Sequence, residues 1–375
     1  MRLAVVSHAC VVDVNQRLFD ELCRHLDVEL LLIAPRRWRA STGLTVEFAP
    51  VAGARFMPHP LPVIGSGQIS LHLYRGLAPV LRDFAPDIVY LGEEPYSLPA
   101  WQALRICRRH GLPLCFASTQ NLAKRFPWPF SAVERAVLDY AALALASTPA
   151  VAEVLRAKGC AGQVAVIPYF VDINLFRPAD RGDLRRELGL QGAVLGYMGR
   201  LTEDKGVEDL AGAADLLWRR GLDVSVLLVG GGPLSERLHE WAHESPPGRV
   251  VLTGPVPHSA AADYLNVLDL LVVPSRTMPN WAEQFGRVLI EAPACGVPVA
   301  GSTSGHIPAL IEELGSGVVF AERDPGALAD AVQGLIEDPE RAAQLARTGR
   351  ARVQERYGLP AVADRLYEVL SAVVG

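Results

Sequence analysis

The sequence lacks the features that would assign it to several common classes of protein. No apolar run approaches the roughly 18 uninterrupted residues of a transmembrane helix. Its six cysteines lack the C-x-x-C spacing of zinc and redox sites. The formal net charge of −5 gives no excess of the basic residues that bind nucleic-acid phosphates. These absences argue against a membrane-spanning chain, a zinc module and a nucleic-acid-binding protein, and they leave peripheral membrane contact open.

The cysteines and the first residues indicate the compartment. Cysteines without a recognisable pairing pattern are typical of reduced, mostly buried thiols in a cytosolic protein. The segment from Met1 to His8 lacks the long apolar core of a signal peptide and predicts a first β-strand. The expected location is cytoplasmic, with the inner membrane surface as the alternative. His8, at the end of this strand, is interpreted as a buried histidine rather than a catalytic one.

Length and hydrophobic pattern predict two α/β domains. A chain of 375 residues, half of them hydrophobic, exceeds the size at which one core keeps growing. Short aliphatic runs alternate with helix-length segments, which is the pattern of βα units around parallel sheets buried on both faces. The first series of predicted strands comprises 3–7, 28–33, 87–91, 114–117, 143–147 and 164–167. The second comprises 193–198, 224–229, 250–252, 270–273, 297–300 and 318–320.

The stretch between the two series of strands sets the domain boundary. Pro168 to Pro178 has the composition of a connecting segment, so the boundary is placed near residue 170. The first domain is predicted to span 1–170 and the second 171–357. The pattern beyond the last strand predicts three helices, at 326–337, 339–356 and 360–373.

The densest chemical signal is the segment from Trp281 to Val299, which follows a predicted strand. Open α/β sheets bind ligands at the carboxyl ends of their strands, which is where this segment begins. A helix beginning near Phe285 would direct the backbone N–H groups of Gly286, Arg287 and Val288 toward an anion. A diphosphate is the obvious candidate.

Two carboxylates lie in this segment, Glu283 before the predicted helix and Glu291 about two turns inside it. The first can accept hydrogen bonds from sugar hydroxyls, and the second can accept both hydroxyls of a ribose. The alternative is structural: Glu283 is an acid favoured at a helix start, and Glu291 is a solvated surface charge.

A second signal is the segment from Gly199 to Gly206, which also follows a predicted strand. Arg200 and Lys205 bracket a short loop, and both can reach one diphosphate. They would stabilise the charge that grows on a departing diphosphate. The alternative is that Arg200 is an ordinary loop charge paired with Glu203 or Asp204.

Glu93 and Glu94 follow another predicted strand, at the ligand edge of the first sheet. Carboxylates there can bind the hydroxyls or the amine of an acceptor. The alternative is a solvated acidic turn before a helix that begins at Pro95. Lys124 opens a loop that mixes basic and aromatic residues, which indicates an acceptor platform or a membrane-surface contact, with simple loop packing as the alternative.

The order of these motifs resembles that of the family-four glycosyltransferases of the GT-B fold, across the whole C-terminal domain. The resemblance implies two doubly wound Rossmann-like domains facing a central cleft, with a C-terminal helix at about 358–375 packing back on the first domain. The motifs that carry it are Gly199-Arg200-Leu201 with Lys205-Gly206, Gly230 to Leu234, Val273-Pro274-Ser275, the Glu283 to Glu291 spacing, and Gly296 to Val299.

The resemblance also implies an activity and roles for residues. Family members transfer a sugar from a nucleotide diphosphate sugar with retention of configuration, without metal or other cofactor. Arg200 and Lys205 would hold the donor diphosphate, Glu283 would contact the transferred sugar, and Glu291 would contact the ribose. Arg200, Lys205 and Glu283 are thus the predicted catalytic residues. The predicted donor site adds Gly199, Phe285, Gly286, Arg287, Val288 and Glu291.

The sequence departs from the family pattern at several positions. Gln284 stands where relatives commonly have Gly or Ser, and Arg287 is charged where many relatives are aliphatic. Residues 10–16 lack the Gly-Gly loop that lets the backbone approach a phosphate. Gln120 and Asn121 follow the strand after which relatives often place a histidine; amides orient sugar hydroxyls but are no base at neutral pH.

Three hypotheses result. The first is glycosyl transfer from a nucleotide diphosphate sugar to an unidentified hydroxyl-bearing acceptor, which is a small molecule, a glycan or a lipid-linked molecule. The second is a nucleotide-sugar epimerase of the same fold, which needs no acceptor. The third is a non-catalytic protein that binds nucleotide sugars. Isomerisation of a labelled nucleotide sugar would favour the second, and binding without turnover would favour the third.

Overall fold

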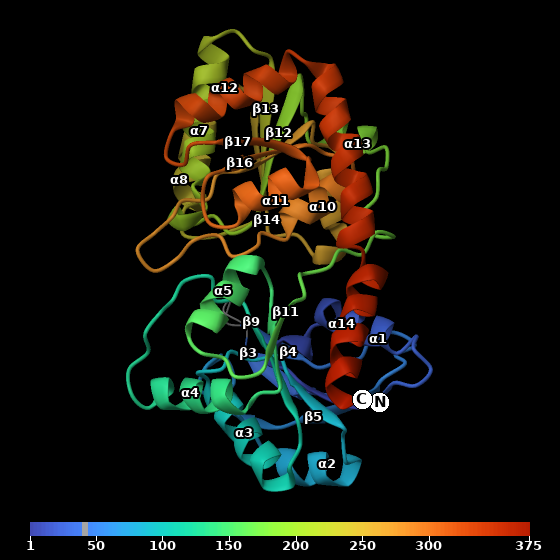
Figure 1. Cartoon of the computed structure of the whole chain (residues 1–375). Helices are drawn as coiled ribbons and strands as arrows, with labels where there is room; N and C mark the ends of the chain where they lie inside the picture. The colour runs from blue at the N-terminus through green and yellow to red at the C-terminus, as the bar shows by residue number, and fades with distance from the viewer. Residues whose placement is uncertain (40–43) are drawn as a thin grey trace. The chain divides into compact units, whose positions relative to one another are not determined.

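The chain forms two compact units. The computed structural model describes residues 1–39 and 44–375. Unit 1 comprises Met1–Pro168 and Leu359–Gly375, and unit 2 comprises Tyr169–Gly358 (Figure 1). The chain divides between Pro168 and Tyr169, whereas the sequence placed the boundary near residue 170. The last helix belongs to unit 1.

Unit 1 is built on a seven-stranded sheet in the order β11-β10-β9-β8-β1-β2-β5, in which every neighbouring pair is parallel. Its inner strands are buried on both faces, which explains their nearly continuous aliphatic sequence. The strands are β1 (Arg2–Val6), β2 (Glu29–Pro35), β5 (Met57–Leu61), β8 (Ile88–Leu91), β9 (Leu114–Ser118), β10 (Leu143–Ala146) and β11 (Gln163–Val166).

Helices cover both faces of this sheet, and each face has its own hydrophobic core. One core combines the sheet with α2, α3, α4 and α5, and the other combines it with α1 and α14. The helices are α1 (Arg17–Leu22), α2 (Leu77–Phe84), α3 (Leu98–His110), α4 (Phe130–Tyr140), α5 (Pro149–Ala157) and α14 (Leu359–Val374). Two 3₁₀ turns follow β1, namely η1 (His8–Val11) and η2 (Asp13–Asn15).

Unit 2 has a six-stranded parallel sheet in the order β14-β13-β12-β15-β16-β17. The order reverses direction between β12 and β15, which is the topological switch point where open α/β sheets bind ligands. The strands are β12 (Ala193–Met198), β13 (Val224–Val229), β14 (Val250–Gly254), β15 (Leu270–Val273), β16 (Val299–Ser302) and β17 (Gly317–Phe320).

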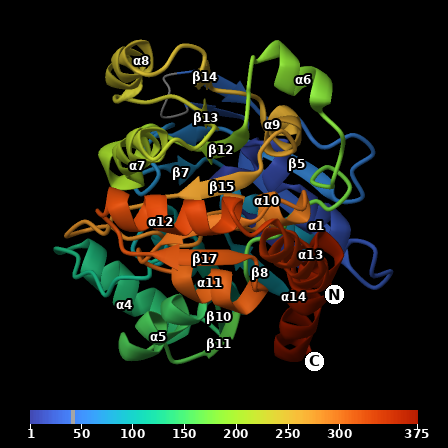
Figure 2. The same cartoon turned by 90° about the horizontal axis from the view of Figure 1, so that it is seen from above.

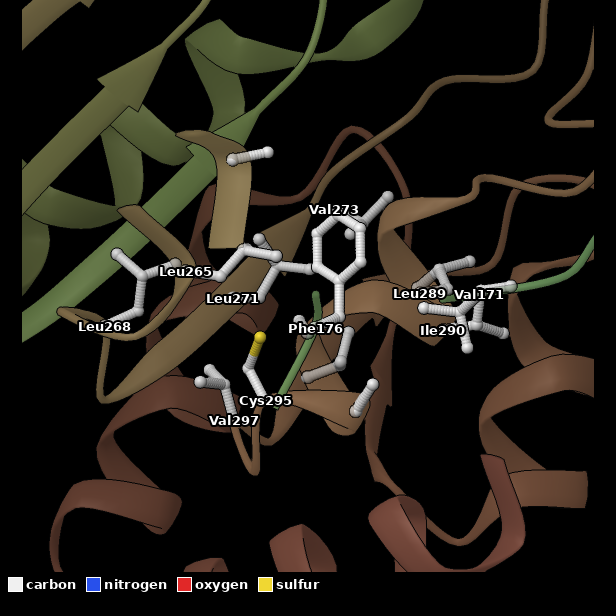
Figure 3. Packing of buried hydrophobic residues seen from close by; sticks show 14 of the residues in the cluster. Val171, Phe176, Leu265, Leu268, Leu271, Val273, Leu289, Ile290, Cys295 and Val297 are labelled. Carbon is white, nitrogen blue, oxygen red and sulfur yellow. The ribbon is translucent and has the colours of Figure 1, made fainter. Parts of the chain in front are cut away.

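Two cores also enclose the sheet of unit 2. On one face α7 and α12 pack side by side, with α8 beyond them (Figure 2). On the other face α9, α10, α11 and α13 contribute to one core that includes Phe176, whose ring lies next to Leu271 and Val273 in Figure 3. The helical elements are α6 (Gly182–Glu187), η3 (Glu203–Lys205), α7 (Val207–Arg219), α8 (Ser235–Glu244), η4 (His258–Ala260), α9 (Ala261–Leu265), α10 (Val288–Ala294), α11 (Ile307–Leu314), α12 (Pro325–Ile336) and α13 (Pro339–Arg356).

Several helices begin at a capping side chain that the sequence makes recognisable. Thr148, Asp324 and Asp338 each precede a proline, and each accepts a hydrogen bond from a backbone N–H in the first turn, at 3.3, 2.9 and 2.9 Å. Such caps satisfy N–H groups that have no partner within the helix, and proline is well tolerated at the first helical position. No helix within 1–39 or 44–375 combines the length and apolarity that crossing a membrane requires.

Some strands of unit 1 were not predicted. β5 lies at the sheet edge and contains Pro58 and Pro60, which lack an N–H for ladder pairing. Proline is confined to edge strands for this reason, and it hid the strand from pattern reading. Two short antiparallel ribbons were also missed, one formed by β3 (Arg37–Arg39) with β4 (Thr45–Glu47) and one by β6 (Val63–Ile64) with β7 (Leu73–Tyr74).

The last helix, α14, packs against α1 within unit 1. Leu366 and Leu370 are fully buried in the core that contains α1. The ring of Tyr367 stacks on His25 with centroids 3.9 Å apart, and its hydroxyl donates to Asp27 Oδ2 at 2.8 Å. Unit 1 is therefore assembled from two segments that lie far apart in the sequence.

Candidate functional site

A largely buried ion pair lies at the carboxyl ends of adjacent strands in unit 2. Lys205 lies in η3 after β12, and Glu283 lies in the loop after β15, the parallel neighbour of β12. Lys205 Nζ is 2.6 Å from Glu283 Oε2, and the Ser275 hydroxyl donates to the same oxygen at 2.9 Å. The Lys205 ammonium also lies 4.5 Å from the centroid of the Trp281 ring. Two residues predicted to contact one donor are thus in direct contact.

A second ion pair positions the two loops that carry this pair. The Arg276 guanidinium donates to both carboxylate oxygens of Asp209, at 2.8 and 2.6 Å, and Asp209 is 4 % exposed. The hydrogen bonds from Arg276 to Asp209 raise the pKa of the guanidinium. The backbone N–H of Arg276 also donates to the carbonyl of Asp204 at 2.8 Å. The loop after β15 is therefore fixed to the loop that bears Lys205.

Arg200 occupies a different environment from Lys205. Its side chain is 67 % exposed, and its Nη2 is 3.6 Å from Asp204 Oδ2. The structure thus contains the pairing with Asp204 that the sequence allowed as an alternative. Its backbone is fixed, because the Tyr197 hydroxyl donates to the Arg200 carbonyl at 2.6 Å. The side chain projects from an anchored loop, which leaves it room to change partners.

Gly199, before Arg200, takes part in a close backbone approach. A Cβ built on Gly230 would lie 1.8 Å from the Gly199 carbonyl oxygen, and φ at Gly230 is +142°. Gly199 has φ of +155°, and a Cβ there would meet the Tyr197 hydroxyl at 2.9 Å. Neither position accepts a side chain without movement of the backbone or of Tyr197. The two glycines therefore set the path of the loop that bears Arg200.

The helix expected near Phe285 begins three residues later, at Val288. The reason is Gly286, whose φ of +72° is incompatible with a continuous right-handed helix. The Gly286 carbonyl accepts the N–H of Leu289 at 2.8 Å, so Gly286 and Arg287 form a turn that leads into α10. Val288, rather than Gly286, is the first residue of the helix.

Phe285 and Arg287 differ from what the sequence led us to expect. Phe285 is 2 % exposed, and its ring lies within 5.1 Å of Tyr169 and 5.9 Å of Tyr357, measured between centroids. Its side chain is a core element, so contact with a donor would fall to its backbone. The Arg287 guanidinium lies 4.7 Å above the Tyr169 ring, a cation–π contact within unit 2.

Glu291 is buried rather than solvated, which corrects the surface-charge alternative. It is 8 % exposed, and its Oε1 lies 3.4 Å from His258 Nε2. Because α10 begins at Val288, Glu291 lies in the first turn of the helix and not two turns inside it. A carboxylate in a first turn is stabilised by the N–H groups of the helix start.

Glu93 and Glu94 have separate partners in unit 1. Glu93 is 3 % exposed and accepts hydrogen bonds from His8, so the solvated acidic turn is wrong for this residue. Burial raises the pKa of Glu93, but hydrogen bonds from His72 and His8 outweigh it, so the pKa is lowered overall. Glu94 accepts from the Ser118 hydroxyl at 2.7 Å. Burial nevertheless raises the pKa of Glu94.

The other residues predicted on the acceptor side lie after β9. The Ser118 hydroxyl that donates to Glu94 also accepts the N–H of Gln120, at 3.3 Å. Asn121 and Lys124 follow in the same loop, both partly buried, and the Lys124 N–H donates to the Leu122 carbonyl at 2.8 Å. The structure thus links Glu94 to the segment containing Gln120, and Lys124 is placed further along the loop.

The segment that replaces the Gly-Gly loop of the family is held by one glutamine. Gln16 is fully buried; its amide donates to the carbonyls of Cys10 and Ala49, both at 2.9 Å. Its side-chain oxygen accepts the N–H of Val51 at 3.0 Å. Residues 8–15 therefore form two 3₁₀ turns with fixed positions. This corner of unit 1 is a rigid structure without glycine.

Sequence reasoning missed several residues that hold the site together. Ser275 and Arg276 lie just beyond the end of β15, after Pro274, and that position was the available signal for both. Asp209 and His258 gave none, because each contacts a residue far away in the sequence. His8 was interpreted as a buried histidine, and it is the direct partner of Glu93. The sequence Glu93-Glu94 does not by itself indicate that the Glu93 carboxylate is buried.

Two family descriptions match successive parts of the chain. "Glycosyl transferase 4-like domain" matches residues 11–169, and "Glycosyl transferases group 1" matches residues 180–352. Among solved structures, Anabaena HepE (Alr3699) in complex with UDP aligns with a TM-score of 0.76 at 20% identity, covering 99% of both chains. The chain therefore belongs to the family-four glycosyltransferases of the GT-B fold.

Curated relatives fall into two groups by coverage. D-inositol 3-phosphate glycosyltransferase 1 of Catenulispora acidiphila is 36% identical over 54% of this chain. The match covers 50% of that relative, so the chain matches about half the length of the first relatives. The GDP-mannose-dependent alpha-(1-6)-phosphatidylinositol monomannoside mannosyltransferase of Mycobacterium tuberculosis is 28% identical, over 91% of this chain and 89% of the relative.

Proposed function

We propose that the protein is a retaining, metal-independent glycosyltransferase, which moves a sugar from a nucleotide diphosphate sugar to a hydroxyl-bearing acceptor. The observation that carries this proposal is the Lys205–Glu283 ion pair, 2.6 Å long and largely buried, at the topological switch point of unit 2. It combines a cation for a phosphate with a carboxylate for sugar hydroxyls in one place. Family membership supports the same activity.

When a donor binds, the two residues of the ion pair would contact different parts of it. A diphosphate would compete with Glu283 for the Lys205 ammonium, because both are oxygen anions. Glu283, which is also held by Ser275 at 2.9 Å, would then accept hydrogen bonds from the transferred sugar. Arg200, on its anchored loop, would exchange Asp204 for the diphosphate and form a bidentate contact.

The proposed reaction needs charge stabilisation more than a protein base. The bond from the anomeric carbon to the diphosphate breaks, and the acceptor hydroxyl oxygen bonds to the same face of that carbon. The hydroxyl proton passes to the departing diphosphate oxygen, so no protein nucleophile is consumed. Arg200 and Lys205 would stabilise the negative charge on the leaving group, in place of a metal ion. Glu291, buried in the first turn of α10, would accept the ribose hydroxyls.

The donor base and the acceptor are tested together by a focused panel. Relatives bear names that specify GDP-mannose, D-inositol 3-phosphate and phosphatidylinositol monomannoside, and a structural neighbour was solved with UDP. The donors to test are the guanosine, uridine, adenosine and thymidine diphosphates and their sugars. A nucleotide that binds only the folded state stabilises it, by about 2.7 kcal/mol at 100 times its Kd, and so raises the melting temperature.

The decisive measurement is sugar transfer with the donor that gives the largest thermal shift. Product with retained anomeric configuration, formed in the presence of a chelator, is the expected result. An isomerised nucleotide sugar in the absence of acceptor would indicate the epimerase instead. Binding without transfer or hydrolysis across the acceptor panel would indicate a nucleotide-sugar-binding protein.

A further inference from the structure

Three polar residues of unit 1, two of them buried, meet at the ligand edge of its sheet. His8 follows β1, Glu93 follows β8, and these two strands are parallel neighbours. His72 precedes β7 and is fully buried. The three side chains offer nitrogen and oxygen atoms that lie within 4.8 Å of one another. The predicted donor residues, in contrast, all belong to unit 2.

Glu93 is at the centre of the cluster and is held as a carboxylate. Its Oε2 lies 2.6 Å from His8 Nδ1, and its Oε1 accepts the backbone N–H of His8 at 2.7 Å. The Tyr74 hydroxyl and His72 Nε2 approach Oε1 at 3.4 and 3.5 Å. The ring and backbone N–H groups of His8 and the Tyr74 hydroxyl compensate this buried carboxylate for the loss of water. Glu93 therefore cannot also bind an acceptor directly.

The hydrogen bonds determine which ring nitrogens carry hydrogen. His72 Nδ1 lies 3.0 Å from the Ile69 carbonyl oxygen, which can only accept, so Nδ1 carries a hydrogen. His8 Nδ1 faces the ionised Glu93 and carries a hydrogen for the same reason. Of the two ring nitrogens of His8, Nδ1 is the one for which a partner is found within 1–39 and 44–375. In a neutral ring the second nitrogen, Nε2, is then a hydrogen-bond acceptor.

The ring of His8 is fixed in orientation and still reaches solvent. It packs against Trp38 and His72, with ring centroids 4.9 and 5.4 Å away. The His8 side chain is 17 % exposed, whereas those of His72 and Glu93 are at most 1 % exposed. His8 is therefore the member of the cluster through which a ligand can make contact.

We propose that Glu93 and His72 hold His8 so that its Nε2 accepts a hydrogen bond from a hydroxyl group of the acceptor sugar or polyol. This inference rests on the proposed function and identifies an acceptor-binding residue for it. His8 makes the contact, and Glu93 is a positioning residue that fixes the ring and its tautomer. The assignment replaces the earlier expectation that Glu93 itself binds the acceptor.

The distances favour this site over a metal site. Two ligand atoms sharing a tetrahedral zinc lie about 3.3 Å apart, because each bond is about 2.0–2.1 Å long. The 2.6 Å between His8 Nδ1 and Glu93 Oε2 leaves room for a hydrogen atom but not for an ion. The whole protein, purified without chelator and analysed for metal, should contain no stoichiometric zinc. One equivalent of zinc that is lost in His8→Asn would overturn the proposal.

The first test reads the ring nitrogens by NMR in the full chain labelled with ¹⁵N-histidine, with His8→Asn assigning the signals. His8 should be the Nδ1–H tautomer, and its Nε2 signal should shift on addition of myo-inositol or methyl α-mannoside. Glu93→Gln should mix the two tautomers without unfolding the chain. A protonated Nε2, or an Nε2 signal that neither probe shifts, would overturn the proposal.

The second test is kinetic and uses His8→Asn, which keeps a side-chain N–H for Glu93 and removes the atom at Nε2. The KM for the best acceptor of the panel should rise about 3- to 10-fold, the effect of one neutral hydrogen bond. The thermal shift with nucleotide diphosphate should not change. His25→Asn is the matched control, because His25 Nε2 pairs with Asp364 at 3.1 Å in the same unit.

The outcomes separate this proposal from the proposed function. If the wild type transfers sugar and His8→Asn has an unchanged KM for the acceptor, the assignment of His8 is wrong and the transferase stands. If the wild type transfers no sugar from any donor, the transferase proposal fails. The NMR titration needs no turnover, and it still decides whether His8 contacts a polyol.

Discussion

Glu93 and Glu94 are adjacent in the sequence, yet the structure moves their pKa values in opposite directions. They follow β8, which lies between β1 and β9 in the sheet, and each carboxylate bonds to a different neighbour. Glu93 turns to His8 after β1, and the histidines lower its pKa despite burial. Glu94 turns to Ser118 at the end of β9, where burial outweighs the hydrogen-bond donors and raises its pKa.

The raised pKa of Glu94 predicts a stability cost at neutral pH. Protonated Glu94 favours the folded state, so its contribution is complete below the unfolded pKa, near 4.5, and is lost as pH rises through the folded value. Glu94→Gln should therefore gain stability relative to wild type as pH rises above about 4.5. Urea unfolding from pH 4 to pH 7 measures this difference, and a difference that does not change with pH would contradict it.

Glu93→Gln should show the opposite dependence. The lowered pKa means that ionised Glu93 stabilises the folded state above its unfolded value, near 4.5, and that this stability is lost as pH falls through the folded pKa. The variant should be least stable relative to wild type at neutral pH, and the gap should narrow in acid. A gap that widens in acid would mean that the histidines do not hold the carboxylate as an anion.

Lys205→Ala should reduce turnover by about 100-fold or more, because it removes a cation from the proposed leaving group. It should also cost about 1–3 kcal/mol of stability, since Glu283 loses a buried partner. Lys158→Ala is a matched control: Lys158 pairs with Glu134 at the same 2.6 Å and is similarly buried, but belongs to unit 1. Steady-state kinetics and urea unfolding of both variants give the comparison. Equal turnover of the two variants would count against the role of Lys205.

Glu291→Gln should weaken binding of the donor nucleotide about 10-fold. An amide keeps one acceptor oxygen, whereas a carboxylate can accept from both ribose hydroxyls, and one hydrogen bond to a charged group contributes about 1.5–3 kcal/mol. Glu340→Gln is the control, because Glu340 also lies in the first turn of a helix and is exposed. Calorimetric titration with the nucleoside diphosphate and its 2′,3′-dideoxy analogue tests the assignment. The variant should lose affinity only for the ribose form.

Gly230→Ala should destabilise unit 2 by about 3 kcal/mol or more, because its Cβ would meet the Gly199 carbonyl at 1.8 Å. Gly221→Ala isolates the conformational part of this cost. Gly221 also has positive φ, at +80°, but a Cβ there meets nothing within 4 Å, so about 1–2 kcal/mol is expected. Urea unfolding of the two variants measures the difference. Equal losses of stability in the two variants would show that the loop before Arg200 can move to accommodate the added methyl group.

The repeating strands were predictable because burial on both faces leaves a strong aliphatic signal. Every strand in the two predicted series exists, with ends displaced by at most a few residues, as Val28–Ile33 against Glu29–Pro35 illustrates. β5 escaped because Pro58 and Pro60 are typical of loops and are tolerated only where a sheet ends. A continuous aliphatic run indicates burial on both faces, and the edge strand β5, most of whose residues are not buried, lacks such a run.

The site was predictable in composition but not in its internal contacts. Motif order identified Lys205 and Glu283, and parallel topology explains why they meet. The start of α10 was misplaced because a glycine in the motif, Gly286, adopts positive φ, which residue type permits but does not specify. The contact between His8 and Glu93 joins residues that the sequence separates widely, and only the order of the strands brings them together.

The position of α14 affects how the protein can be synthesised and dissected. Unit 2 is a continuous segment and can complete its core as soon as residue 358 has left the ribosome. Unit 1 starts first and finishes last, because the surface around α1 is covered only when residues 359–375 arrive. A nascent chain therefore carries an uncovered apolar face through most of translation. We therefore expect residues 169–358 to fold as one piece, and 1–168 to require α14, supplied as a separate peptide or joined through a permuted linker.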